Sequence, residues 1–142
     1  MSDRLLFTIG YQGRTVKALV LRLREAGVTR VVDVRFSPAS PKPGFSGPAL
    51  RRALEKAGLE YRGLAEVGNP FREEAAEDLP GALAKYRAHL AARPDLPSLV
   101  LEAAAGARTA LLCSEANPAR CHRSVLTEVV AAAAPGLRVV NL

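Results

Sequence analysis

Several residue types that support particular functions are scarce in this chain. Its 142 residues contain no tryptophan, three tyrosines and four phenylalanines, too few for the interleaved aromatic residues of a platform that stacks single-stranded nucleic acid. No apolar run approaches the ~20 residues of a membrane span, and the first residues lack the pattern of a secretory signal. We therefore expect a cytoplasmic protein with no membrane partner.

Cysteine and histidine are also scarce, with two of each. Both cysteines, Cys113 and Cys121, lie with His122 in the segment 111–124, LLCSEANPARCHRS. In a chain without a secretory signal, two cysteines are more often reactive or metal-binding than joined in a structural disulfide. The segment therefore indicates a functional site without naming a reaction.

The overall composition indicates one globular domain over residues 1–142. Hydrophobic residues make up 49% of the chain, which excludes disorder, and this length is sufficient for a substantial core. The net charge is +6, and 16 arginines outnumber four lysines. Arginine suits carboxylates and phosphates, so the charge fits an anionic partner, including nucleic acid. A general enrichment of the sequence in Ala, Pro and Arg explains the overall charge equally well.

Apolar patterns predict alternating strands and helices. Thr15 is a candidate cap for the first helix and Gly27 a stop signal. Strands are expected over residues 5–9, 30–34, 59–64, 109–113 and 138–141. Helices are expected over residues 16–26, 48–57, 80–92, 96–105 and 121–133. The alternation predicts an α/β domain with a mainly parallel sheet flanked by helices, in a Rossmann-like three-layer arrangement.

In open parallel sheets, ligands bind at the carboxyl ends of the strands. The chemistry-bearing residues of this chain follow three predicted strands, so we expect them to converge on one edge as an anion-binding pocket. A simpler alternative for Asp33 and Arg35 is a mutual salt bridge. For Glu115 the simpler alternative is a solvated residue of the loop. The expected anion-binding residues are Gly10, Arg14, Asp33, Arg35, Glu115, Arg120 and Arg123.

Cys121 stands at the predicted start of a helix, where unpaired N–H groups and the helix dipole favour a thiolate. We therefore expect Cys121 as a nucleophile and His122 as its base or proton donor. Neighbouring helical residues point about 100° apart, so contact between the two does not follow from adjacency. The alternatives for Cys121 are a non-covalent role in lining the site and a purely structural one.

Three interpretations of Cys113 are open. It fills the edge of the core, pairs with Cys121 in a redox disulfide, or joins Cys121 and His122 at a soft metal site. The metal spacing matches no recognised pattern, and we assign no metal and no cofactor. A phosphatase-like loop requires an arginine six residues after the cysteine, where this chain has Ala119.

Five segments together resemble a known family. They are TIGYQGRT (8–15), VVDVR (31–35), PGFS (43–46), LAEVGNP (64–70) and LLCSEANPARCHRS (111–124), and they resemble the domain of unknown function 488 (DUF488) family. The resemblance covers nearly the whole chain and implies a compact α/β domain. Many relatives have His and then Ser or Asn after the first glycine, where this chain has Tyr11 and Gln12.

The sequence thus favours an enzyme that acts on a phosphate-bearing small molecule or a nucleotide through a reactive cysteine. Two alternatives stay open: a nucleic-acid-associated module without catalysis, and a thiol redox or metal-sensing protein.

Overall fold

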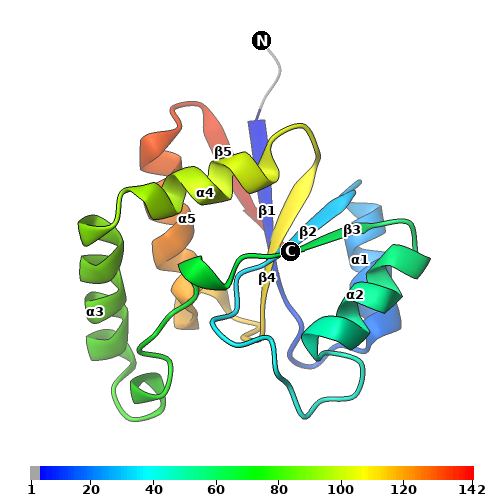
Figure 1. The fold of residues 1–142 in the computed structure, drawn as a ribbon, viewed down its shortest axis with the longest axis horizontal. Helices are drawn as coiled ribbons and strands as arrows, with labels where there is room; N and C mark the ends of the chain where they lie inside the picture. Colours follow the sequence, from blue (N-terminus) through cyan, green and yellow to red (C-terminus); the bar gives the residue numbers. More distant parts are fainter. Residues whose placement is uncertain (1–3) are drawn as a thin grey trace.

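The computed structural model describes residues 4–142 and contains a five-stranded sheet between two layers of helices (Figure 1). The strands are β1 (Arg4–Gly10), β2 (Arg30–Asp33), β3 (Glu60–Gly63), β4 (Thr109–Cys113) and β5 (Leu137–Asn141). The helices are α1 (Val16–Glu25), α2 (Gly47–Lys56), α3 (Leu79–Ala92), α4 (Asp95–Ala104) and α5 (His122–Ala133). Every expected strand and helix is present, and each boundary lies within one residue of the expectation. Among the residues described, three short 3-10 turns complete the fold: η1 (Ala65–Val67), η2 (Glu74–Ala76) and η3 (Pro118–Arg120).

The sheet has the order β3-β2-β4-β1-β5, and each pair of neighbouring strands is parallel. The expectation of a mainly parallel sheet is therefore confirmed. Two of the inner strands are covered completely, since every residue of β2 and β4 is buried, the charged Arg30 and Asp33 of β2 included. Burial on both faces is typical of parallel strands that carry helices on each side.

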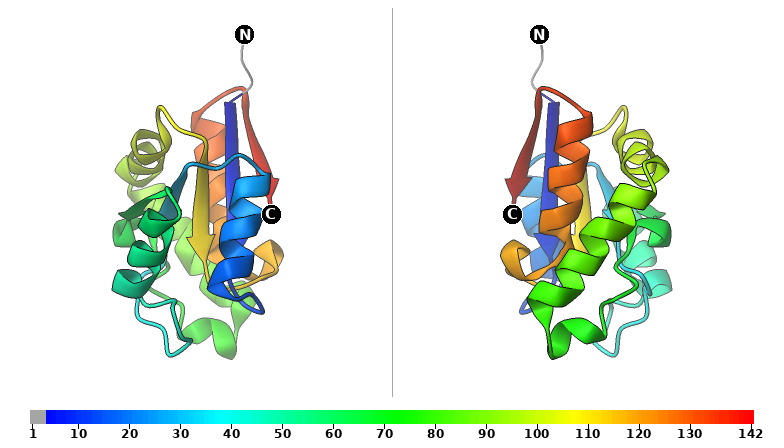
Figure 2. Two further views of the ribbon diagram at one scale, coloured as in Figure 1. Left: turned by 90° about the vertical axis from the view of Figure 1, so that its right-hand side faces the viewer. Right: turned by 90° about the vertical axis from the view of Figure 1, so that its left-hand side faces the viewer.

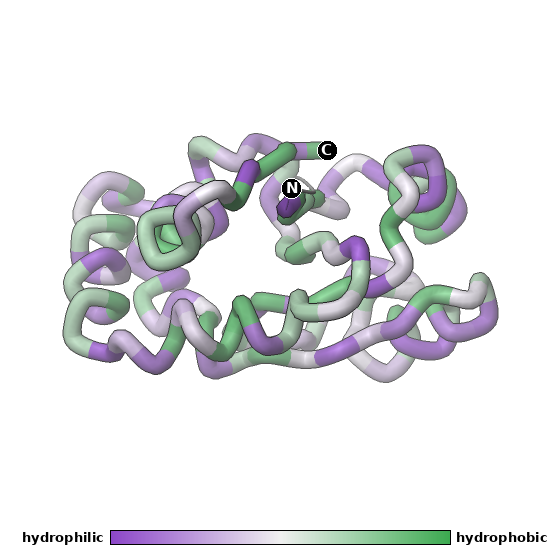
Figure 3. Tube along the Cα trace, turned by 90° about the horizontal axis from the view of Figure 1, so that it is seen from above, coloured by the Kyte–Doolittle hydropathy of each residue, from purple (hydrophilic) through white to green (hydrophobic). Residues whose placement is uncertain are grey.

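Figure 2 shows helices on both faces of the sheet. Two hydrophobic clusters fill the spaces between these layers. Helices α1 and α2 cover one face with residues such as Leu19 and Leu50. Helices α3, α4 and α5 cover the other with residues such as Leu90, Leu96 and Leu126. Hydrophobic and hydrophilic residues alternate around these helices (Figure 3) because only one side of each meets the core. No helix among residues 4–142 is long and apolar enough to cross a bilayer.

Candidate active site

The carboxyl ends of β1 and β4 meet directly, with Gly10 opposite Cys113 in the parallel register. Residues 114–120 then leave β4 and lead into α5, passing close to β1. A Cβ atom built on Gly10 would lie 1.9 Å from the carbonyl oxygen of Glu115. Only glycine therefore permits this approach of the loop to the strand.

Arg123 binds the same loop through hydrogen bonds from its side chain. Its side chain is buried, and it donates from Nη2 to the carbonyl oxygens of Glu115 (2.7 Å) and Ala116 (3.4 Å). Its Nη1 donates to Thr8 Oγ1 at 3.4 Å. Among the described residues, its Nε is the buried side-chain nitrogen or oxygen atom that lacks a hydrogen-bond partner. The guanidinium thus binds backbone of its own chain.

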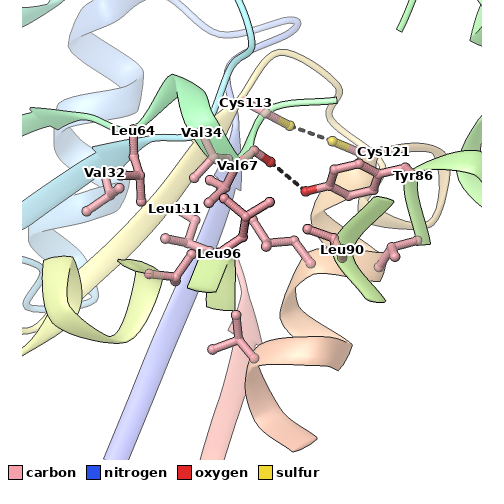
Figure 4. Packing of buried hydrophobic residues seen from close by; sticks show 14 of the residues in the cluster. Val32, Val34, Leu64, Val67, Tyr86, Leu90, Leu96, Leu111, Cys113 and Cys121 are labelled. Carbon is pink, nitrogen blue, oxygen red and sulfur yellow. Dashed lines mark hydrogen bonds between the residues drawn. The ribbon is translucent and has the colours of Figure 1, made fainter. Parts of the chain in front are cut away.

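Cys121 is the residue that caps the amino-terminus of α5. Its backbone is extended (φ −130°, ψ 150°), and its Sγ accepts the N–H of Arg123 at 3.5 Å. Its Sγ lies 2.7 Å from that of Cys113 (Figure 4). The hydrogen bond with Cys113, then the interactions with His122 and the Arg123 N–H, lower the pKa of Cys121 against the opposing effect of burial. Cys121 is therefore favoured as a thiolate.

His122 lies beside this sulfur. Its Nδ1 is 3.6 Å from Cys121 Sγ and its Nε2 is 3.0 Å from the carbonyl oxygen of Val34. A carbonyl only accepts hydrogen bonds, so this contact assigns a proton to Nε2. In the neutral ring Nδ1 then carries a lone pair, which can take the proton of the Cys121 thiol. The Tyr86 ring meets the imidazole edge-on at 5.4 Å.

Cys113 is the partner that supplies a proton to the pair. Burial, followed by the interactions with Cys121, raises the pKa of Cys113 above its ordinary range. Cys113 therefore stays a neutral thiol and donates, while the Cys121 sulfur accepts. Both cysteines are free and buried.

Asp33, the last residue of β2, forms a buried ion pair with Arg35. Arg35 donates to both carboxylate oxygens of Asp33, at 2.8 Å from Nε and 2.6 Å from Nη2, and to the Phe45 carbonyl at 2.7 Å. Tyr61 also donates to Asp33, at 2.6 Å. Burial lowers the pKa of Arg35, but the hydrogen bond and charge of Asp33 outweigh it and raise that pKa. The mutual salt bridge, the simpler of the two expectations, is present.

A pocket of about 210 Å³ joins these groups at the carboxyl edge of the sheet. It brings together three of the residues expected at the site: Arg35, Cys121 and His122. A larger hollow of about 490 Å³ lies at the opposite edge, but neither cysteine nor histidine lines it. The lining of the smaller pocket consists of Tyr11, Arg35, Phe36, Ser37, Ala39, Asn69, Arg72, Cys113, Ser114, Cys121 and His122.

Other expected residues do not line this pocket. Asp33 reaches it only through Arg35. The Arg14 side chain donates to the carbonyls of Gly10 and Leu142. Backbone N–H groups of the turn that contains Gly10 and Arg14 also donate to backbone carbonyls, including those of Cys113 and Ser114. The remaining three lie in or under the loop over β1: Glu115, Arg120 and Arg123.

The lining residues that were not expected at the site include Tyr11, Phe36, Asn69 and Arg72. Asn69 had a signal, because it stands in the LAEVGNP segment and is a buried polar residue. Tyr11 stacks on Phe45 with ring centroids 4.4 Å apart. Arg72 lies over the Phe36 ring, 4.6 Å from its centroid, and forms no ion pair with the acidic residues in the described part of the chain.

Within residues 4–142, no group of three or more His, Cys, Asp or Glu side chains is arranged to hold a metal ion.

Comparison with known proteins identifies a family but no function. The family model described as "Domain of unknown function DUF488" matches residues 15–130. Among solved structures, the crystal structure of a protein from Shewanella putrefaciens CN-32, named "Putative phosphatase (DUF442)", is 13% identical. The alignment covers 93% of this chain and 87% of that one, with a TM-score of 0.42, too low to support an argument about the site. No curated protein matches the chain.

Proposed function

We propose that this chain, which belongs to the DUF488 family of domains of unknown function, is an enzyme that acts on a small anionic molecule through the thiolate of Cys121. The observation that carries the proposal is the set of groups around one sulfur. Cys113, His122 and the N–H of Arg123 all approach Cys121 Sγ, and this sulfur lines a pocket that also contains arginine.

The surroundings of Cys121 are those of an activated nucleophile. A thiolate is the reactive form of cysteine, and cationic neighbours and helix amino-termini favour it. The Cys121 sulfur has both, because it caps α5 and lies beside His122. A thiol that merely filled space would need neither an imidazole held by a second hydrogen bond nor access to a pocket.

Arg35 and Arg72 give the pocket its preference for an anion. The three side-chain hydrogen bonds of Arg35 use three of its five N–H donors, which leaves up to two for a ligand. Arg72 brings a positive charge that no acidic side chain pairs within residues 4–142. A guanidinium binds phosphate and carboxylate oxygens in a fork, so a phosphate-bearing small molecule or nucleotide suits the pocket.

The proposed chemistry is nucleophilic substitution. The Cys121 thiolate forms a bond to the electrophilic centre that carries the anionic group, while the bond from that centre to the leaving group breaks. The leaving group departs with the proton from Nδ1 of the His122 imidazolium. Water then attacks the same centre, gives its proton back to His122, and releases the sulfur as a thiolate.

The volume of the pocket limits the substrate. At about 210 Å³ it is smaller than the roughly 300–1,000 Å³ of sites for drug-sized ligands. A phosphate with the few atoms attached to it fits this space, whereas the rest of a nucleotide would extend past Arg72 and Phe36 toward solvent.

The test is the rate at which iodoacetamide alkylates Cys121 as a function of pH, with and without inorganic phosphate. Trypsin releases Cys121 in the peptide CHR, so mass spectrometry reads this cysteine separately from Cys113. We expect the rate to rise well below the ordinary thiol pKa of about 8.5, and phosphate to slow it. The variant Arg72→Ala should lose the effect of phosphate, whereas Arg52→Ala, an exposed arginine of α2 outside the pocket, should keep it.

Two results would contradict the proposal. If the alkylation rate of Cys121 rises with an inflection at a pH near 8.5, Cys121 is not an activated nucleophile. Low-pH alkylation that phosphate leaves unchanged in the parent chain would reject the anion pocket. Salt-sensitive binding of nucleic acid that leaves Cys121 unprotected would instead favour a nucleic-acid-associated module.

A further inference from the structure

We propose that Cys113 is a resolving thiol, which forms a reversible disulfide with Cys121 when a small hydroperoxide oxidises the latter. The inference rests on the proposed thiolate character of Cys121 and adds a second role for the same pocket. It assigns Cys113 a function that neither core packing nor substrate binding requires.

The geometry of the two sulfurs carries the inference. They come from different elements, the end of β4 and the cap of α5, yet their Sγ atoms lie 2.7 Å apart (Figure 4). A disulfide bond measures about 2.0 Å, so only a small approach is needed to form it. The other hydrogen bond of Cys113 Sγ within residues 4–142, to the Glu115 carbonyl, is long at 4.0 Å. Cys121 is therefore the close polar partner of Cys113 in this part of the chain.

Access to the pair selects the oxidant. The two cysteines are only 2% and 5% exposed, and both line the 210 Å³ pocket. Thiols this little exposed are hard for a bulky disulfide to reach with its sulfur, whereas hydrogen peroxide is little larger than water. The pocket therefore fits a small hydroperoxide better than an oxidised peptide thiol.

The reaction balances with that single oxidant. The Cys121 thiolate attacks one peroxide oxygen, the O–O bond breaks, and Cys121 becomes a sulfenic acid. The departing hydroxide takes the Nδ1 proton of the His122 imidazolium and leaves as water. Cys113 sulfur then attacks Cys121 sulfur, and the sulfenic hydroxyl leaves with the Cys113 proton as a second water. The two cysteines together lose two electrons, which the peroxide gains.

The disulfide switches the site off and protects it. With its sulfur bonded to Cys113, Cys121 cannot attack a substrate. It also cannot proceed to the sulfinic acid, an oxidation that simple thiols do not reverse. A dithiol reductant restores both thiols, so the loss of reactivity is temporary.

The experiment measures, on the full chain, the disulfide that forms between the two cysteines and the oxygen atoms that each cysteine gains. The protein is treated with hydrogen peroxide, quenched by alkylation, and cut with trypsin, which places Cys113 in TALLCSEANPAR and Cys121 in CHR. We expect these two peptides to be joined by a disulfide that dithiothreitol reverses. In Cys113→Ser, which keeps a hydrogen-bond donor at this position, Cys121 should react with dimedone and, without dimedone, gain two oxygens. In Cys121→Ser, Cys113 should stay largely unoxidised.

Several outcomes would overturn the resolving role. One is sulfinic acid on Cys121 in the parent chain, formed as fast as in Cys113→Ser. Another is a disulfide between two chains in place of the internal one. Because the peptide link is measured in the unaltered protein, the result does not depend on whether a variant folds. The alkylation profile of Cys121 is read separately under reducing conditions. A low inflection with phosphate protection but no disulfide rejects only this inference, and an inflection near 8.5 rejects the proposed enzyme.

Discussion

Nδ1 of His122 lies 3.6 Å from Sγ of Cys121, although the two residues are adjacent in the chain. Two consecutive residues inside a helix would diverge by about 100°. Here only His122 belongs to α5, and Cys121 is its extended cap. The change of backbone conformation at this position turns the sulfur back toward the imidazole, and the Val34 carbonyl holds the other side of the ring.

Replacing His122 should slow the reaction of Cys121 with alkylating agents near neutrality. The variant His122→Asn places an amide near the position of Nδ1 but cannot hold a proton as a cation. The pKa of Cys121 is lowered to about 4. Because an adjacent opposite charge shifts a pKa by about 1–3, its loss should slow alkylation at about pH 6 by up to roughly tenfold. His89→Asn is the matched control, since His89 stacks near Tyr86 without a contact to Cys121. Equal rates in both variants would contradict the assigned role of the imidazole.

Removing the carboxylate of Asp33 should strongly destabilise the fold. In Asp33→Asn the buried Arg35 loses its paired charge, which costs about 3–5 kcal/mol for a buried pair. Urea unfolding measures this loss. Asp95→Asn breaks a similar two-oxygen contact with Arg93 at the surface and should change stability little. Similar losses in both variants would show that burial of the Asp33–Arg35 pair has no special importance.

Gly10 should not tolerate a methyl group. In Gly10→Ala the new Cβ would overlap the Glu115 carbonyl, so the loop over β1 must move, at a cost of about 1–3 kcal/mol. The displaced loop also loses its contact with Arg123, so alkylation of Cys121 should change as well. Gly63→Ala, also in a strand but with no atom within 4 Å of its Cβ, should be neutral or slightly stabilising. If unfolding in urea shows no difference between the two variants, the close approach at Gly10 is incorrect.

The stability of the reduced protein should depend on pH through Cys121. Its hydrogen bonds with Cys113 and His122 lower the pKa of Cys121 in the folded state, whereas the unfolded value is about 8.5. A depressed pKa stabilises the fold above the unfolded value, and this contribution is lost as the pH falls toward the folded value. Each unit of difference corresponds to about 1.4 kcal/mol.

The parent chain should therefore lose stability relative to Cys121→Ser when the pH falls from about 8 to 5. Above about 8.5 the raised pKa of Cys113 acts in the opposite direction, since the folded state then resists losing a proton that the unfolded state gives up. Urea unfolding at a series of pH values, in the presence of a reductant, measures both effects. A stability difference that stays constant with pH would contradict the thiolate.

Much of the architecture could be predicted from local patterns. Thr15 caps α1 as expected, because a hydroxyl before an apolar helical pattern accepts an N–H of the first turn, here that of Ala18 at 3.1 Å. The pocket residues were harder to predict. Arg72 and Asn69 follow β3 by several residues, and no local period links them to Cys121. They reach the pocket because residues 64–72 turn back across the end of β2.

The sequence by itself determined the strands, the helices and the placement of Cys113 and Cys121 at a strand end and a helix start, since these follow from periodicity and capping along the chain. Only the tertiary structure decided which side chains face the pocket. Arg123 is the clearest case, because its donors bind the loop carbonyls of Glu115 and Ala116, whereas Arg35 lines the pocket with Cys121. A buried guanidinium binds whichever acceptors the fold brings within reach, and long-range packing sets those acceptors.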